Sequence, residues 1–225
     1  MATFVLVPGT YHGGWWYGPI AEELRGHGHT VHALTLTGVG ERNHLLNASI
    51  NLHTHIEDIV QALDNEEIED AILVGHSYGG MPITGAADRR PERIASLVYL
   101  DSFAPRDGES ELDILPADWR QQTLAAAAGN GFAMVPPAFL TAKDARVTSH
   151  PLATKLQRIR LTGAHEQVNR RTYVHSSGFE GSPFLATYER LRQDPSWTVE
   201  SLPIGHDIIR DAPDYLVKLL LAQVS

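Results

Sequence analysis

Three short apolar runs constrain the fold of this chain more than any other feature of its sequence. They cover residues 3–7 (TFVLV), 71–74 (AILV) and 96–100 (SLVYL). Their apolar residues are continuous rather than alternating, which is typical of strands that are buried on both faces. Such strands occur in parallel sheets that carry helices on each side. The sequence therefore predicts a parallel sheet between two layers of helices.

Strand and helix patterns alternate along the chain, which indicates an α/β fold. Further strands are expected at 30–36, 171–176 and 198–202. Helices are expected at 19–25, along an apolar stripe from Leu52 to Leu63, between the third strand and Pro91, and at 213–223. No repeat or linker divides the chain, and 225 residues suit one well-buried core. We expect a single domain, 1–225, with a doubly wound, mostly parallel six-stranded sheet.

The stretch from about 103 to 170 breaks this alternation, because it contains no clear strand. Residues 112–127 have a helical pattern, which Gly129-Asn130-Gly131 and then Pro136-Pro137 interrupt. Long excursions between strands are often functional lids. We therefore predict that this insertion forms a small helical lid.

Composition and charge exclude several classes of protein. The net charge of −9 disfavours nucleic-acid binding, because an acidic surface repels phosphate. The chain has no cysteine, which excludes disulfides, thiolate metal sites and cysteine nucleophiles. It has neither an apolar run long enough to cross a membrane nor the pattern of a signal peptide near its start. We expect a cytoplasmic protein that binds neither nucleic acid nor membranes; its oligomeric state is left open.

A G-x-S-x-G motif, GHSYG at residues 75–79, directly follows the apolar run at 71–74 and precedes a predicted helix. In this context the motif is typical of a sharp turn that exposes a nucleophilic serine. The glycines leave room for the strained backbone, and the serine lies at a helix N-terminus. Ser77 is therefore the predicted nucleophile; the alternative is a glycine-rich turn with an inert serine.

A serine hydroxyl is a weak nucleophile and needs a general base. His206 follows the last predicted strand and precedes the closing helix, so the chain order is serine, then histidine. We expect His76 to pack beneath the turn and His12 to line the site. The early histidines, which we expect to be solvated or to cap helices, are His27, His29, His32, His44, His53 and His55. No histidine cluster has the spacing of a metal site, so no metal is expected.

The loop after the first strand reads PGTYHGGWW (residues 8–16). Its glycines allow backbone N–H groups to face the serine turn. We expect the oxyanion hole to consist of the backbone N–H groups of Thr10 and of Tyr78, the residue after the nucleophile.

Together these segments resemble the α/β-hydrolase superfamily. The resemblance is carried by residues 4–16, 24–42 (LRGHGHTVHALTLTGVGER), 74–80 (VGHSYGG), 96–110 (SLVYLDSFAPRDGES) and 205–213 (GHDIIRDAP). Within it, the chain is most similar to plant methyl esterases, hydroxynitrile lyases and their bacterial esterase relatives. The resemblance implies the α/β-hydrolase fold, a cofactor-free site under a small lid, and carboxylic esters as substrates.

Two positions separate the chain from the lyases of that group. The lyases have a threonine where this chain has Gly9 and a lysine where it has Asp207, and those two residues handle the cyanohydrin hydroxyl and the departing cyanide. Their absence favours an esterase. Pro8 also replaces a histidine that is usual in the oxyanion loop, which changes the support of the loop but not its N–H donors.

The acid that orients His206 is the least determined residue. The resemblance implies an aspartate after the strand at 171–176, but residues 176–181 read SSGFEG. Asp101 directly follows the strand at 96–100, which should neighbour the strand that leads to Ser77. Because the functional ends of parallel strands share one edge, we expect Asp101 to be the acid. Glu180 is the alternative; Glu166 and Asp207 fit less well, since the first precedes its strand and the second is expected to cap a helix.

The predicted function is hydrolysis of a small, mostly apolar ester through an acyl-enzyme, without a cofactor. The alternatives are lactone opening or another non-hydrolytic reaction at the same site, and a small-molecule receptor without turnover. An apolar pocket is indicated by aromatic residues that could equally be packed in the core: Trp15, Trp16, Tyr78, Phe132 and Phe139.

Overall fold

The computed structural model describes residues 1–224, and its main feature is a parallel sheet in the strand order β2-β1-β3-β4-β7-β8. All pairings within this sheet are parallel. The strands are β1 (Thr3–Val7), β2 (Thr30–Ala33), β3 (Ala71–His76), β4 (Ile94–Leu100), β7 (Arg170–Ser176) and β8 (Thr198–Leu202). The chain adds β2 on one side of β1 and then β3 and the later strands on the other side, so the sheet is doubly wound. The predicted fold class is therefore confirmed.

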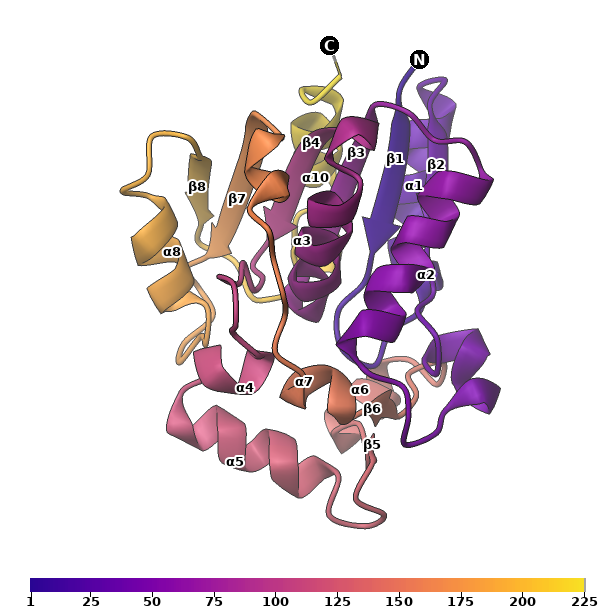
Figure 1. Cartoon of the computed structure of the whole chain (residues 1–225), viewed down its shortest axis with the longest axis vertical. Coiled ribbons are helices and arrows are strands. Elements are labelled where there is room, and N and C mark those ends of the chain that lie inside the picture. Colours follow the sequence, from indigo (N-terminus) through magenta and orange to yellow (C-terminus); the bar gives the residue numbers. More distant parts are fainter. Residues whose placement is uncertain (225) are drawn as a thin grey trace.

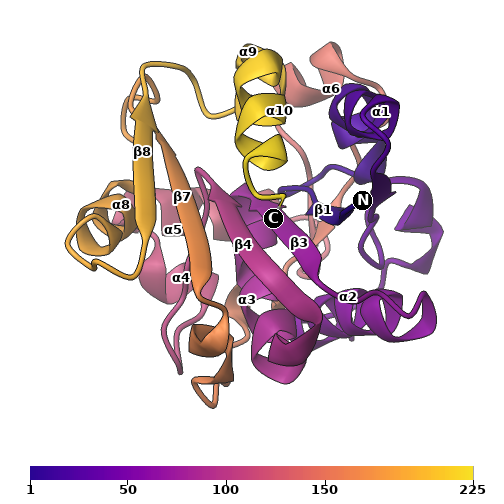
Figure 2. The same cartoon turned by 90° about the horizontal axis from the view of Figure 1, so that it is seen from above.

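Helices cover both faces of the sheet (Figure 2). On one face lie α1 (Gly18–Gly26) and α10 (Pro213–Leu221), which contact each other. On the other lie α2 (Leu52–Asn65) and α3 (Gly80–Arg89), with α8 (Leu185–Leu191) beside β7. Shorter elements of this part of the chain are η1 (Gly14–Tyr17), η2 (Gly40–Leu45), η3 (Ser77–Gly79), η4 (Pro91–Arg93) and α9 (Ile208–Asp211).

Two separate hydrophobic cores explain why the strands read as continuous apolar runs. Along β1, Val5 and Val7 pack into the core beneath α2 and α3, while Phe4 and Leu6 pack into the core beneath α1 and α10. Successive side chains of a strand point to opposite faces, so a strand that faces a core on each side must be apolar throughout.

The insertion between β4 and β7 lies across the carboxyl ends of the strands from α4 to α7, and its last part returns along α3 to η5 (Figure 1). It contains α4 (Glu111–Ile114), α5 (Ala117–Ala126), β5 (Ala133–Met134), α6 (Ala138–Lys143), β6 (His150–Pro151), α7 (Ala153–Leu156) and η5 (Ala164–Gln167). Two expectations for this region were wrong. The helix predicted at 112–127 is broken at Leu115-Pro116, where Leu115 is extended, and β5 pairs with β6 as a minimal antiparallel sheet.

Boundaries elsewhere differ by a few residues. The strand predicted at 30–36 ends at Ala33; beyond it, Thr35 Oγ1 accepts a hydrogen bond from Gly14 N–H and Thr37 Oγ1 donates one to Asp58. Over residues 1–224, no helix is long and apolar enough to cross a membrane.

Candidate active site

Ser77 lies in a strained turn between β3 and α3. Its φ of 54° is in the left-handed region, which costs energy for a residue with a side chain. The turn is tight enough to require glycine on either side: a Cβ on Gly75 would come within 2.7 Å of Gly79 O, and one on Gly79 within 2.5 Å of Val7 O. The motif predicted from sequence therefore forms the expected strand–turn–helix junction.

The loop after β1 packs directly against this turn. A Cβ on Gly9 would lie 2.9 Å from the Cβ of Ser77 and 3.2 Å from Nδ1 of His76. A side chain at position 9 would therefore push the loop away from Ser77. The same contact brings Thr10, the next residue, to the edge of the turn.

Asp101 and His206 are brought together at the carboxyl edge of the sheet. Asp101 Oδ2 lies 2.7 Å from Nδ1 of His206, and the Asp101 side chain is fully buried. Its other oxygen, Oδ1, accepts a hydrogen bond from Ser176 N–H at 3.1 Å and lies 3.2 Å from Nδ1 of His175. With a φ of 41°, the backbone of Asp101 is as strained as that of Ser77. Ser77 and Asp101 directly follow the neighbouring strands β3 and β4, so they lie at adjacent strand ends.

The charge state of Asp101 follows from these contacts. Burial by itself raises the pKa of the carboxyl, but hydrogen bonds from His175 and His206 and the amide of Ser176 outweigh it and hold the pKa below its usual value. An ionised Asp101 fixes the proton of His206 on Nδ1, so Nε2 is the nitrogen that can accept a proton.

His206 is held from several sides. Its carbonyl oxygen accepts a hydrogen bond from Nε2 of His76 at 2.9 Å. Its ring stacks on that of Phe184, with 5.2 Å between the ring centres, and the centre of the Phe179 ring lies 5.0 Å from it. His76 packs beneath the turn as predicted, and burial lowers its pKa to about 3, so it remains neutral.

The other candidate acids do not approach His206 in this way. Glu180 and Glu166 are exposed. Asp207 occupies the N-terminal cap position of α9, as expected, although its side chain makes no capping hydrogen bond.

A buried polar cluster beside the turn was missed from sequence. The Tyr78 side chain is fully buried, and its hydroxyl lies 2.8 Å from Nδ1 of His55. We had expected His55 to be solvated or to cap a helix, and this was wrong, because its side chain is fully buried. Lys155 Nζ lies 3.9 Å from the centre of the Tyr78 ring and 2.9 Å from Glu111 Oε2. The residues come from distant parts of the chain, and no local pattern connects them.

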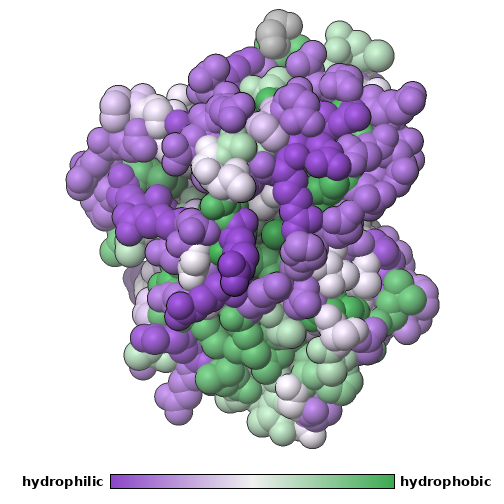
Figure 3. Space-filling view, viewed as in Figure 1, coloured by the Kyte–Doolittle hydropathy of each residue, from purple (hydrophilic) through white to green (hydrophobic). Residues whose placement is uncertain are grey.

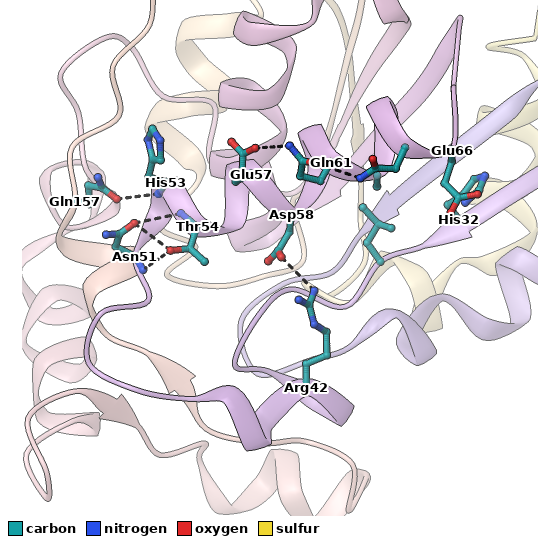
Figure 4. Close-up of a pocket in the computed structure, with 13 residues that line it drawn as sticks. His32, Arg42, Asn51, His53, Thr54, Glu57, Asp58, Gln61, Glu66 and Gln157 are labelled. Carbon is teal, nitrogen blue, oxygen red and sulfur yellow. Dashed lines mark hydrogen bonds and ion pairs between the residues drawn. The ribbon is translucent and has the colours of Figure 1, made fainter.

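A surface pocket of about 840 Å³ lies elsewhere, along α2 and the edge strand β2 (Figure 4). Among its charged side chains, Arg42 pairs with Asp58 at 3.1 Å and Glu57 pairs with Arg89 at 2.9 Å. None of the predicted site residues lines it. Neither its position nor its chemistry relates it to Ser77.

Comparison with known proteins places these observations in context. A model of the alpha/beta hydrolase family matches residues 4–222. A carbendazim hydrolyzing esterase of Nocardioides sp. (strain SG-4G) is 40% identical to the chain, and the alignment covers 99% of each protein. Methylesterase 10 of Arabidopsis thaliana is 32% identical over 45% of the chain, a match that spans 38% of that relative's length.

Solved structures show the same architecture. An extracellular alpha/beta-hydrolase from a Paenibacillus species superposes with a TM-score of 0.84 at 23% identity, covering 99% of each chain. That protein is described as sharing structural and functional homology with tobacco salicylic acid binding protein 2.

Proposed function

Because the chain belongs to the alpha/beta hydrolase family, among carboxylic ester hydrolases, we propose that it cleaves small apolar esters through an acyl-enzyme on Ser77. The observation that carries the proposal is the 2.7 Å contact between Asp101 Oδ2 and His206 Nδ1, beside the strained turn that presents Ser77. The proposed catalytic triad is thus Ser77, His206 and Asp101.

Acylation begins when Ser77 Oγ attacks the ester carbonyl carbon while His206 Nε2 takes the hydroxyl proton. Asp101 stabilises the imidazolium that forms and keeps its ring in the productive orientation. The backbone N–H groups of Thr10 and Tyr78 donate to the oxyanion of the tetrahedral intermediate. The imidazolium then gives its proton to the departing alcohol.

Deacylation repeats these steps with water. His206 activates a water molecule that attacks the acyl carbon, and the acid product leaves with Ser77 restored. Each step uses only side chains and backbone N–H groups of this chain.

Apolar side chains around His206 support a substrate with an apolar body. Phe184 and Phe179 flank the imidazole, and Trp119 of α5 lies 6.0 Å from Phe179 in an edge-to-face arrangement. The insertion 103–170 therefore reaches the wall of the site through Trp119, which supports its role as a lid over the reacting groups.

The test is labelling by a fluorophosphonate, followed by turnover of a panel of substrates. The panel contains p-nitrophenyl acetate, methyl esters of short and aromatic acids, simple lactones, and carbendazim, which the 40% identical relative is named for hydrolysing. We expect labelling of the wild type, none of Ser77→Ala, and fastest turnover of small apolar esters.

Other results would favour the alternatives. Faster turnover of lactones than of open esters would favour ring opening. A single burst of p-nitrophenol without turnover would favour a receptor that retains the site without acting as a catalyst.

A further inference from the structure

We propose that Lys155, paired with Glu111, is a positioning residue that connects the insertion to both segments of the oxyanion hole. The inference rests on the proposed function, because it concerns the same site. Lys155 lies on α7 and Glu111 on α4, so both belong to the insertion, whereas Thr10 and Tyr78, which Lys155 contacts, belong to the turns at the sheet edge.

The Lys155 ammonium occupies a site built for a cation. Its Nζ donates to Thr10 Oγ1 at 2.7 Å and to Glu111 Oε2 at 2.9 Å, and it lies 3.9 Å from the centre of the Tyr78 ring. An ammonium has three N–H donors, and these contacts supply a hydroxyl oxygen, a carboxylate oxygen and an aromatic face. Thr10 and Tyr78 are the two residues whose N–H groups are proposed to bind the oxyanion.

Stability alone does not explain this pair. The Lys155 side chain is fully buried and that of Glu111 nearly so. Burial lowers the pKa of Lys155 and raises that of Glu111, while their mutual attraction opposes both shifts. Well-packed apolar residues in place of a buried ion pair are often as stable or more stable. What apolar residues could not supply is a directed bond to Thr10 together with a contact on Tyr78.

The geometry explains how Lys155 acts on the site. Its hydrogen bond fixes the Thr10 side chain, which stiffens the backbone that carries the Thr10 N–H. Its charge on the ring holds Tyr78, whose hydroxyl is anchored by His55 at 2.8 Å and whose ring packs edge-on against His150 at 4.8 Å. Preorganised donors are worth most in the transition state, so loss of Lys155 should affect kcat more than KM.

The decisive experiment compares Lys155→Met with the double variant Lys155→Met/Glu111→Gln, which leaves no charge unpaired. Lys143→Met, an exposed lysine of the same insertion, is the control. We expect the single variant to be less stable than the double variant in urea unfolding, because only the single variant leaves the Glu111 charge buried without a partner. We expect both to lose roughly 10- to 100-fold in kcat with KM nearly unchanged, below the loss of a whole donor.

Two further measurements separate positioning from support of the fold. Affinity for butylboronic acid, which forms a tetrahedral adduct with an active serine, should fall in parallel with kcat. Thr10→Val keeps the backbone N–H of residue 10 but removes the hydroxyl that accepts the hydrogen bond from Lys155. If the hydroxyl acts through Lys155, Thr10→Val should change kcat little when Lys155→Met is already present.

The outcomes are distinct. Wild-type kcat in the double variant, or additive effects of Thr10→Val and Lys155→Met, would overturn the positioning role. Amide exchange at residues 8–12 and 76–80, which needs no turnover, should accelerate in the double variant, and unchanged exchange would also overturn it. Absence of ester turnover and of fluorophosphonate labelling in the wild type would instead refute the proposed function.

Discussion

The sheet with its turns and the insertion between β4 and β7 differ in how completely they bury their apolar side chains. In the sheet, side chains such as Leu73 and Val98 are completely buried. In the insertion, all helices except α5 are short, and large apolar side chains remain on the surface, which Figure 3 shows as green atoms over the lower part of the molecule. They are Leu124 at 48%, Val135 at 60%, Phe139 at 64% and Leu156 at 47% exposure.

Backbone rigidity is needed mainly in the first of these two regions. Strained residues such as Ser77 and Asp101 need surroundings that over-determine their backbone, and the buried strand ends provide these surroundings. The insertion buries fewer apolar side chains: Ala127, Met134, Val147 and Leu152 cluster with Tyr11 of the loop after β1. Lys155 and Trp119 also extend from the insertion toward the site. The triad should therefore depend on the sheet, whereas the insertion should control access to the site and, through Lys155, the rigidity of the oxyanion hole.

The largest effect is expected at the sheet edge, from removal of the nucleophile. Ser77→Ala should lower kcat by roughly 10³-fold or more with an unchanged fold, because the site of covalent attachment is lost. Ester hydrolysis and circular dichroism measure the two properties, and the exposed Ser49→Ala is the matched control. Activity close to wild type would remove Ser77 from the mechanism.

The next largest loss of kcat is expected at Asp101, at the end of β4, in contrast to Glu180 on a loop outside the sheet. Asp101→Asn should cost on the order of 10²–10⁴ in kcat, because an amide stabilises the wrong tautomer of His206. Glu180→Gln, on an exposed loop, should be nearly silent. The reverse result in steady-state kinetics would transfer the role of the acid to Glu180.

Stability should divide in the same way between the two regions. Leu73→Ala should lower the free energy of unfolding by about 2–5 kcal/mol, because it opens a cavity in a core that is closely packed. Leu124→Gln on α5 should change it by less than about 0.5 kcal/mol. Urea unfolding measures both, and equal losses would contradict the comparison.

Acid should lower the stability of the protein through a buried histidine that lies next to the insertion. Burial lowers the pKa of His55 to about 4, and its ring lies 5.6 Å from that of His150 in the insertion. An unfolded histidine titrates near pH 6.5, so between about pH 6.5 and 4 the unfolded state binds more protons. The free energy of unfolding should therefore fall by a few kcal/mol as pH drops through this window.

The variant His55→Gln tests this assignment. It should be less stable at pH 7 but lose less stability between pH 7 and 4 than the wild type. An identical pH dependence in urea unfolding would show that other groups control the acid response.

The smallest effect is a difference in local opening. Amides of α5 and α6 should exchange faster than those of β3, because their region has fewer buried apolar contacts. Hydrogen exchange resolved by mass spectrometry measures it. Equal protection would argue against a lid formed by 103–170.

Elements with a local sequence pattern could be predicted before the fold was known. Continuous apolar runs identified β1, β3 and β4, since a strand facing two cores must be apolar at each position. The motif around Ser77 identified its turn for an equally local reason, because only glycine leaves room for that backbone. The broken helix at Leu115-Pro116 and the β5–β6 pair carried weaker signals, as the energy of such short elements comes from their surroundings.

Contacts between residues far apart in the chain could mostly be known only from the folded structure. Asp101 was placed near His206 by reasoning about strand order, but the second histidine on its carboxylate, His175, was not foreseen. Nor was the contact of Lys155 with Thr10, which joins residues 145 positions apart. Buried polar groups select partners by three-dimensional proximity and the need to satisfy every donor, and neither requirement leaves a periodic trace along the chain.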